Sequence, residues 1–508
     1  MTSISEKSFW SQPRTLVAYA LSLLALAEIV DLTIVAVAVP QIMGSIGADI
    51  DSIALVTTSY IVAAAVCILL SGLVIRKFGM RKVTIISAIV FCVSSILCGT
   101  STSLFEMVLF RIIQGIGGAF LPAIAQAYIA QKFKNKEQQI MMTIFSLIVV
   151  MGPIIGPILG GALCENMTWR WIFYVNVPIC IIALLIIWVW MEKDHVKDTK
   201  IDYISFLLMA FGIGLLEYVI DEGNSDNWFE SFSIIITFFS SLILLGFFIW
   251  RGILGQSIVK LSLFKNYNFV LSCFTMFVFI TFATGSLAYF PTMLQQSYNY
   301  PVDLAGYITA PRGITAICTA LIMPRIIPLI GARMVIFFGM ILFSAGCFLL
   351  SSYGPAVSKG LVIFSMILQG IGMMSFFAPI MSIAYVGIAD EDSSDASGIF
   401  NFFRNFGSSV GTSLAATIIS HQSQVNYHGL GGHISPYARG FEWWSQDLSG
   451  FSDQHIIAIA NQELIKQSSF ISYLDSYHLF AIGMLCILWV PLLMKRSKKK
   501  ATTTPKHH

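Results

Sequence analysis

Apolar stretches long enough to cross a membrane recur along the whole chain, and they leave few folds open to it. A membrane-spanning helix needs about 20 apolar residues, and the runs between charged or turn-rich breaks give fourteen such segments. Only 11% of the 508 residues are charged, against about 25% in a soluble protein. We therefore predict an all-α polytopic membrane protein. Its spans are expected at 15–38, 53–75, 83–101, 105–129, 140–164, 171–191, 203–221, 232–250, 269–291, 304–324, 334–352, 360–385, 397–420 and 473–494.

The distribution of lysine and arginine supports this number of spans. Cytoplasmic loops of membrane proteins carry an excess of these residues. If the N-terminus is cytoplasmic and the sides alternate, cytoplasmic segments hold 23 of the 30 Lys and Arg, external segments four and the spans three. We therefore predict that both termini are cytoplasmic. The net charge of +3 is explained by this topology and indicates no role with nucleic acids.

One span carries the sequence GPIIGPILGG, with two prolines and four glycines in ten residues. In a bilayer a helix tolerates such residues, because neighbouring helices satisfy the freed backbone groups. Glycines spaced four apart leave one face bare, so another helix can approach at backbone distance. We predict a kinked, closely packed helix that takes part in a conformational change, through Gly152, Gly156, Pro157, Gly160 and Gly161.

Two short motifs occur twice at nearly the same offset. QGIG begins at Gln114 and again at Gln369, and Gly79-Met80-Arg81 is echoed by Gly331-Ala332-Arg333. Two such matches predict two related six-helix halves with two additional helices between them. The expected parts are 1–200 (N-terminal half), 201–268 (two inserted helices and a cytoplasmic linker), 269–500 (C-terminal half, with an external loop at 421–472) and 501–508 (tail).

Four motifs, in order and on the expected spans, resemble the major facilitator superfamily. They are VDLTIVAVAVP from Val30, GLVIRKFGMRK from Gly72, RIIQGIGGA from Arg111 and GPIIGPILGG from Gly152. Within that superfamily the chain is similar to the fourteen-span drug:proton antiporters of the EmrB type. The resemblance implies two six-helix halves plus two inserted helices, and a location in the bacterial inner membrane.

The same resemblance implies a gate in the loop between the second and third spans, formed by Gly72, Lys77, Gly79 and Arg81. This chain has Arg76 where the family usually has an acidic residue, so the usual charge relay there is in doubt. In the first span, Ala36 stands where the family usually has Asn, so one polar contact is missing.

Charged residues inside spans are the candidates for proton coupling, because a charge at membrane depth costs roughly 2.5–3.5 kcal/mol and persists where it is paired or titrates. Glu28 and Asp31 share a face of the first span. They repel each other, which favours proton uptake by one of them, and we expect Asp31 to be the principal proton site. Arg111 is expected to pair with either carboxylate. Glu217, in the first inserted span, faces a central cavity or pairs locally.

Polar and aromatic side chains near mid-membrane are the candidates for substrate binding. The expected residues are Gln114, Asn401, Arg404, Tyr60 and Phe377. Gln114 and its repeat copy also fit a purely structural role, and most aromatic residues in such a protein serve packing. The external loop at 421–472 is either a solvated loop or a surface that docks a partner or covers an external opening.

These features predict proton-coupled export of hydrophobic or amphipathic drugs by alternating access, in a secondary transporter that is not an enzyme. A dedicated exporter of a metabolite, such as a siderophore or a fatty acid, has the same motifs, and an uncoupled facilitator is a further alternative. No Walker A sequence is present, and we expect no metal site and no cofactor. The resemblance further implies a periplasmic adaptor protein and an outer-membrane channel as partners.

Overall fold

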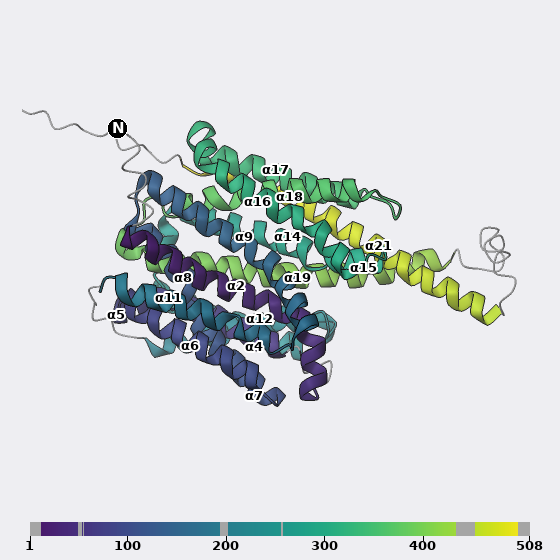
Figure 1. Ribbon diagram of the computed structural model, residues 1–508, viewed down its shortest axis with the longest axis horizontal. Coiled ribbons are helices and arrows are strands. Elements are labelled where there is room, and N and C mark those ends of the chain that lie inside the picture. The colour runs from purple at the N-terminus through teal and green to yellow at the C-terminus, as the bar shows by residue number, and fades with distance from the viewer. Residues whose placement is uncertain are drawn as a thin grey trace, which may run out of the picture.

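The computed structural model describes residues 12–48, 53, 55–193, 202–255, 258–432 and 453–495. These residues form long helices that run roughly along one direction (Figure 1). The all-helical prediction is therefore confirmed for the described chain. Residues in the expected tail, and the side chain of Ala36, lie outside what the structure describes.

The first group of helices forms the N-terminal half. Its central contact is between α2 and α9, and α4, α6, α7 and α11 pack around them. The bounds are α2 (Pro13–Ile46), α4 (Leu55–Ile68), α5 (Ser71–Phe78), α6 (Met80–Thr100), α7 (Leu104–Gly118), α8 (Phe120–Lys132), α9 (Asn135–Asn166), α10 (Trp171–Tyr174) and α11 (Asn176–Trp190).

Two helices follow between the halves, α12 (Tyr203–Glu222) and α13 (Phe232–Ile253). Asp202 caps α12 by accepting from two backbone N–H groups, and Arg251 near the end of α13 donates to it at 2.9 Å. The hydrogen bond from Arg251, with those from Ser205, lowers the pKa of Asp202 to about 2. This charged contact joins the two inserted helices at one end.

The second group forms the C-terminal half, in which α17 packs on α18 and α14 packs on α19. The bounds are α14 (Tyr267–Ala288), α15 (Phe290–Gln296), α16 (Val302–Ile330), α17 (Ala332–Ser351), α18 (Lys359–Ala384), α19 (Ser393–Gly431), α21 (Asp453–Cys486) and α22 (Val490–Leu493). The two halves meet where α9 contacts α16 and α18, and where α19 contacts α5 and α8.

Among the described residues, eleven helices are long and apolar enough to cross a membrane, or up to thirteen if each of two bent helix pairs counts as one span. The first bent pair is α4 with α5, and the second is α9, which bends after Pro153. α19, which holds the expected span 397–420, is not among them, because it carries Asn401, Arg404 and several serines. The fourteen expected spans are compatible with this arrangement, and the chain is a multi-pass membrane protein.

The glycine face of α9 packs against α2 as its spacing predicts. A Cβ atom at Gly152 would collide with Ile29, and one at Gly156 with Thr33. At Gly160 a Cβ would lie 3.0 Å from a side-chain carbon and from the carbonyl oxygen of Ile34 on α2. Gly161 differs, because nothing lies within 4 Å of the place of its Cβ. It therefore takes no part in this close contact in the conformation described.

The two copies of the Gly-x-Arg turn have the same backbone and the same role. Gly79 and Gly331 have φ of 85° and 93°, a region that favours glycine. Arg81 donates to the carbonyl oxygen of Trp188 at 2.6 Å, near the end of the last helix of its half. Arg333 likewise donates to the carbonyl oxygen of Met494 at 2.7 Å. The two motifs are thus structural equivalents in the two halves.

α19 and α21 continue beyond the rest of the bundle as an antiparallel pair (Figure 1). Within the expected external loop, residues 421–431 and 453–472 are therefore helical, and 433–452 lie outside the described residues. The buried residues on this part of α21 recur every four positions, at Ile456, Ala460, Leu464 and Ser468. This spacing gives α21 one continuous buried stripe.

Candidate functional site

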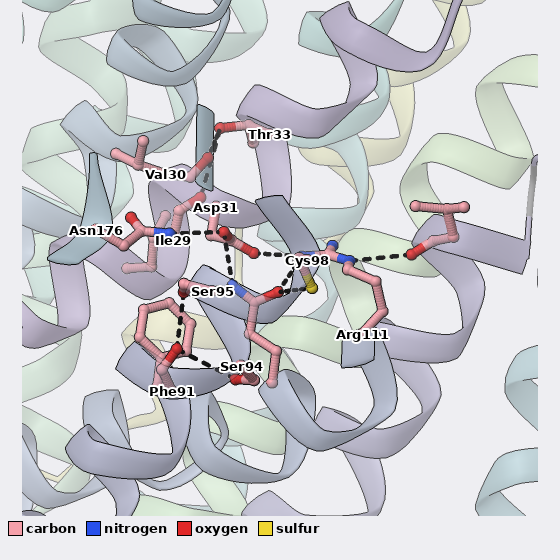
Figure 2. Close-up of polar contacts among 12 residues, drawn as sticks. Ile29, Val30, Asp31, Thr33, Phe91, Ser94, Ser95, Cys98, Arg111 and Asn176 are labelled. Carbon is pink, nitrogen blue, oxygen red and sulfur yellow. Dashed lines mark hydrogen bonds and ion pairs between the residues drawn. The ribbon is translucent and has the colours of Figure 1, made fainter. Parts of the chain in front are cut away.

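A hydrogen-bonded network inside the N-terminal half holds Asp31, and Figure 2 shows its geometry. Asp31 lies in the middle of α2, and Arg111 reaches it from α7 with 2.5 Å between Nη1 and Oδ2. The other carboxylate oxygen accepts from Asn176 at 2.8 Å and from Gln114 at 3.0 Å. Asp31 and Arg111 are both fully buried. The sequence-based pairing of Arg111 with an acid of the first span therefore matches these contacts.

The Gln114 side chain uses both its amide nitrogen and its oxygen for hydrogen bonds within this network. Its Nε2 group also donates to Ser95 at 2.9 Å, and its Oε1 atom accepts from Arg111 at 2.8 Å. The thiol of Cys98 lies 3.6 Å from the same oxygen. In this conformation Gln114 has no free donor or acceptor for a substrate, and it positions Asp31 and Arg111 instead.

Arg111 also contacts an aromatic ring and a carbonyl group, while its Nη2 atom has no hydrogen-bond partner. Its guanidinium lies 4.2 Å from the centre of the Tyr60 ring, a cation–π distance. Its Nε group donates to the carbonyl oxygen of Val56 at 3.1 Å. Because the charge is compensated on several sides, the pair can persist at membrane depth.

A second group of polar side chains lies where the two halves meet. We call it the seam cluster, and it comprises Glu28, Tyr60, Gln126, Asn401 and Arg404. Glu28 is 1% exposed, yet neither of its carboxyl oxygens has a hydrogen-bond partner. A buried carboxylate without a partner is costly. Glu28 therefore differs from Asp31, whose charge is balanced one turn away.

Gly118 brings two members of the seam cluster, Glu28 and Tyr60, close together. The Tyr60 hydroxyl lies 2.9 Å, and the Cγ atom of Glu28 3.2 Å, from the position that a Cβ at Gly118 would take. The Tyr60 hydroxyl is buried and also has no hydrogen-bond partner. The bare surface of Gly118 thus makes room for a carboxyl group and a phenol side by side.

The remaining members of the seam cluster connect the halves. Asn401 on α19 donates to Gln126 on α8 at 2.5 Å, while its own carbonyl oxygen and the amide nitrogen of Gln126 have no partner. Arg404 binds Asn405 at 3.0 Å and is the cation whose charge acts on Glu28. One of its terminal nitrogens is also without a partner. The seam cluster therefore offers several unused polar atoms from both halves.

Glu217 contacts the C-terminal half rather than the seam cluster. It lies on α12, is 1% exposed, and accepts from Ser409 of α19 at 2.7 Å. Its second oxygen has no partner. One turn further, Asp221 accepts a hydrogen bond from Thr58 on α4. α12 is therefore connected to both halves through Glu217 and Asp221.

The predicted gate lies at the end of the bundle that the sequence assigns to the cytoplasm. Arg76 on α5 forms an ion pair with Asp395 at the start of α19, and a Cβ at Gly72 would collide with Asp395. Arg76, which stands where the family usually has an acidic residue, thus has an acidic partner on α19 in the structure. Lys77 lies outside this pair, with its ammonium 5.7 Å from the Phe78 ring.

Phe377, the remaining predicted substrate residue, is fully buried among aromatic rings. The rings of Phe279 and Phe376 stack with centroids 3.7 Å apart, and Phe377 lies edge-on at 5.9 Å from Phe279. Its carbonyl oxygen accepts from Ser146 of α9 at 3.3 Å. This aromatic group therefore lines the contact between the halves.

Comparison with known proteins identifies the architecture. A model of the Major Facilitator Superfamily matches residues 21–412. The chain belongs to the major facilitator superfamily. Among solved structures of this superfamily, the proton:xylose symporter XylE bound to 6-bromo-6-deoxy-D-glucose covers 94% of this chain, which covers 96% of XylE, with a TM-score of 0.60 at 13% identity. At that identity the likeness shows the fold alone.

Two curated relatives from the superfamily align over nearly the full length. The Multidrug export protein EmrB of Haemophilus influenzae is 30% identical over 483 residues, 94% of each chain. The Fatty acid resistance protein FarB of Neisseria gonorrhoeae is 31% identical over 94% of this chain and 95% of its own. The predicted resemblance to the EmrB type is therefore confirmed.

Sequence reasoning missed three residues that the structure brings to these sites, namely Asn176, Gln126 and Asp395. Asn176 and Gln126 are single amides within apolar runs, VNVPI and AIAQAYIA. A buried amide needs a partner, so these two positions carried a usable signal. Asp395 gave a weaker signal in the sequence. Its partner Arg76 is more than three hundred residues away along the chain, and only the fold brings the two together.

Proposed function

We propose that this protein exports hydrophobic or amphipathic compounds across the bacterial inner membrane in exchange for protons, with both termini in the cytoplasm. The names of its full-length relatives, a multidrug exporter and a fatty acid resistance protein, support the export of such compounds. The observation that carries the coupling is the contrast on α2, where Asp31 is fully paired and Glu28 is buried without a hydrogen-bond partner.

In the proposed cycle Glu28 holds the transported proton and Asp31 provides the fixed charge that keeps Arg111 in place. A neutral carboxyl group tolerates the buried site that a bare carboxylate does not. When the halves separate along the seam, water reaches Glu28 and the proton leaves. A substrate that occupies the seam cluster then competes with reprotonation, and this competition makes the exchange obligatory.

The driving force is sufficient for useful accumulation. A membrane potential of 100 mV gives about 2.3 kcal/mol for each charge that crosses, and each 1.4 kcal/mol is a factor of about ten. One proton per cycle therefore sustains a substrate gradient of roughly fiftyfold from the potential alone. Alternating access supplies the pathway, because the seam cluster lies between two halves that can rock against each other.

The dedicated export of one metabolite remains the second candidate, and the fatty acid resistance relative favours it. It shares the proposed coupling and differs only in the range of compounds accepted. An uncoupled facilitator predicts that transport continues when both carboxyl groups of α2 are neutralised.

We also propose a periplasmic adaptor and an outer-membrane channel as partners, which the resemblance to the EmrB type implies. The projecting pair formed by α19 and α21 is the element that extends furthest from the bundle on the expected external side (Figure 1). Truncation within this pair is therefore expected to weaken copurification with an adaptor while it leaves transport in proteoliposomes intact.

Proton release on substrate binding tests the coupling. The purified protein is placed in weakly buffered detergent solution, a lipophilic dye cation is added, and the released protons are measured. We expect Glu28→Gln to abolish release, Asp31→Asn to reduce both release and dye binding, and Glu217→Gln to leave release measurable. Glu463→Gln, which alters an exposed carboxyl group on the projecting part of α21, is the matched control.

Each other outcome points to a different mechanism. Release that survives Glu28→Gln and vanishes in Asp31→Asn returns the proton to Asp31, the site expected from the sequence. Release that vanishes only in Glu217→Gln places it on α12. Dye binding without proton release in the unmodified protein contradicts antiport and favours the facilitator.

A further inference from the structure

The C-terminal half contains a buried arginine whose charge lacks an acidic partner. Arg312 lies on α16, is 1% exposed, and has its guanidinium 5.7 Å from the centre of the Phe343 ring. Among the described residues, its one side-chain hydrogen-bond acceptor is the sulfur of Met373, 3.5 Å from Nη2, and its Nε group has no partner. The ionisable groups near its charge are the Cys347 thiol and the Tyr477 phenol. Within the described part of the chain, no Asp or Glu pairs with it.

This arginine lies in the C-terminal counterpart of the Asp31 network. Gln369 is the repeat copy of Gln114, and at the same offset Ser286 stands where Asp31 stands. Tyr477 of α21 donates to the carbonyl oxygen of Ser286 at 3.0 Å, as Asn176 of α11 donates to Asp31. The C-terminal network therefore has the same amide residue as the N-terminal one, Gln369, but a serine in place of the aspartate.

The arginine of the C-terminal network lies at the position equivalent to Tyr60, not at the position equivalent to Arg111. Arg312 and Tyr60 lie equally far before the equivalent glycines Gly331 and Gly79, so Arg312 takes the place of the ring that covers Arg111. In the N-terminal half an arginine and an aspartate neutralise each other. In the C-terminal half the arginine remains alone, and the cluster carries a permanent positive charge because a guanidinium does not give up its proton in proteins.

Gln369, one turn before the Met373 that Arg312 contacts on α18, also has unused hydrogen-bonding capacity. Neither its amide nitrogen nor its oxygen has a partner, although the side chain is fully buried. In the N-terminal half, the equivalent Gln114 makes four contacts to the acid, the arginine, a serine and a cysteine. The unsatisfied groups of Gln369 and Arg312 match what an absent carboxylate would satisfy.

We infer that Arg312 and Gln369 form a binding site for the carboxylate of an amphipathic organic anion, an inference that rests on the proposed export function and adds a substrate class to it. The planar fork of a guanidinium suits a carboxylate with two parallel hydrogen bonds, and the Gln369 amide supplies a further donor. The anion reaches the site from the seam, because α16 contacts α9 of the other half. We expect cationic substrates to bind at Glu28 instead, so that the two halves accept opposite charges.

Binding of two probes with the same dodecyl chain tests this site. The full chain is reconstituted in nanodiscs of phosphatidylcholine, which carry no net charge, and equilibrium binding of radiolabelled laurate and of dodecyltrimethylammonium is measured by scintillation proximity. Arg312→Gln is expected to weaken laurate binding by about tenfold or more and to leave the cation unchanged. Arg312→Lys keeps the charge without the fork and is expected to be intermediate.

A second variant keeps the test informative if Arg312→Gln does not fold. Ser286→Asp restores an acid at the position equivalent to Asp31, and so supplies Arg312 with an internal partner. We expect this variant to lose laurate binding, to keep cation binding and to unfold at a higher temperature than the unmodified protein. Phosphatidylglycerol added to the nanodiscs is the control for a lipid occupant.

Several outcomes overturn the inference. Equal loss of both probes in Arg312→Gln assigns the arginine a structural role, and unchanged laurate binding in both variants removes the site. Laurate binding that phosphatidylglycerol alone displaces, in a protein that does not transport laurate, assigns the site to a lipid. Failure of the proposed antiport is distinguishable, since it appears as absent proton release while Arg312-dependent laurate binding persists.

Discussion

Two carboxyl groups on the same face of α2 have opposite surroundings. Asp31 receives hydrogen bonds from Arg111, Gln114 and Asn176, whereas Glu28 receives none. Since one group is balanced and the other is not, a change of protonation at Glu28 alters the charge of the seam while Asp31 keeps the N-terminal half intact. The roles proposed for Asp31 and Glu28 differ because their neighbours differ, although both residues are acids.

The Asp31–Arg111 pair allows a double-mutant test. Removing one partner of a buried ion pair typically costs about 3–5 kcal/mol, because the other charge is left uncompensated. We expect Asp31→Asn and Arg111→Gln each to lower the unfolding temperature, and the double variant to lower it by less than their sum. The nine cysteines are free and most are buried, so a thiol-reactive fluorophore reports unfolding. Strictly additive losses contradict a coupled pair.

The pairing of Arg111 with an acid of the first span could be predicted from sequence, because an arginine at membrane depth needs a nearby anion. The charge of Arg404 near Glu28 could not, since α2 and α19 are brought together only by the packing of the halves. The same limit applied to Gln114, whose mid-membrane position is equally typical of a substrate contact. Only the contacts of the folded chain show that its donors and acceptors are used.

At the scale of helices, α9 meets α2 through glycines. Gly156→Ala is expected to destabilise the protein, because the added methyl group collides with Thr33, and overpacking typically costs about 1–3 kcal/mol. Gly161→Ala is the matched control on the same helix, where the space is open and alanine favours the helix by roughly 1 kcal/mol. Unfolding temperatures of both variants decide the point. A similar loss in both would mean that backbone flexibility, not packing, requires these glycines.

The contact between α5 and α19 includes an ion pair between Arg76, which is partly buried, and Asp395, which is buried. Arg76→Asp is expected to open this end of the bundle, because it places two acids together, and Arg76→Asp with Asp395→Arg is expected to close it again. Spin labels on α5 and α19 report the separation by pulsed electron resonance. The exposed pair Lys134–Asp390, with side chains 55% and 66% exposed, is the control, since such pairs contribute little.

Failure of the reversed pair to restore closure would assign the gate to shape alone. That alternative has a basis in the same helices, because Gly72 fits against Asp395 and Gly398 fits against Ser71. The motif in the loop between the second and third spans predicts a gate at this end of the bundle, but it does not indicate the acid on α19. From sequence alone, an acidic residue on a long helix is compatible with many basic partners. The folded structure shows that Asp395 pairs with Arg76.

At the scale of the whole molecule, α12 raises the question of which half it accompanies. On the side of the N-terminal half, Thr58 donates a hydrogen bond to Asp221. From α19 the helix receives two, from Ser409 to Glu217 and from Ser413 to the carbonyl oxygen of Ile220. Trp228, just beyond α12, donates to Thr417 of α19 at 3.0 Å. In the proposed cycle the two halves move relative to each other, so α12 cannot keep both sets of contacts.

We therefore expect α12 to move with the C-terminal half during transport. A bifunctional thiol reagent that joins Trp228→Cys to Thr417→Cys is expected to leave dye transport close to that of the untreated variant. The same treatment of Thr58→Cys with Asp221→Cys is expected to stop transport, since it fixes α12 to the half from which it must separate. The exposed Cys318 and Cys486 are first replaced by serine. The opposite pattern would assign α12 to the N-terminal half, and inhibition by both crosslinks would make α12 a hinge whose contacts on each side change in every cycle.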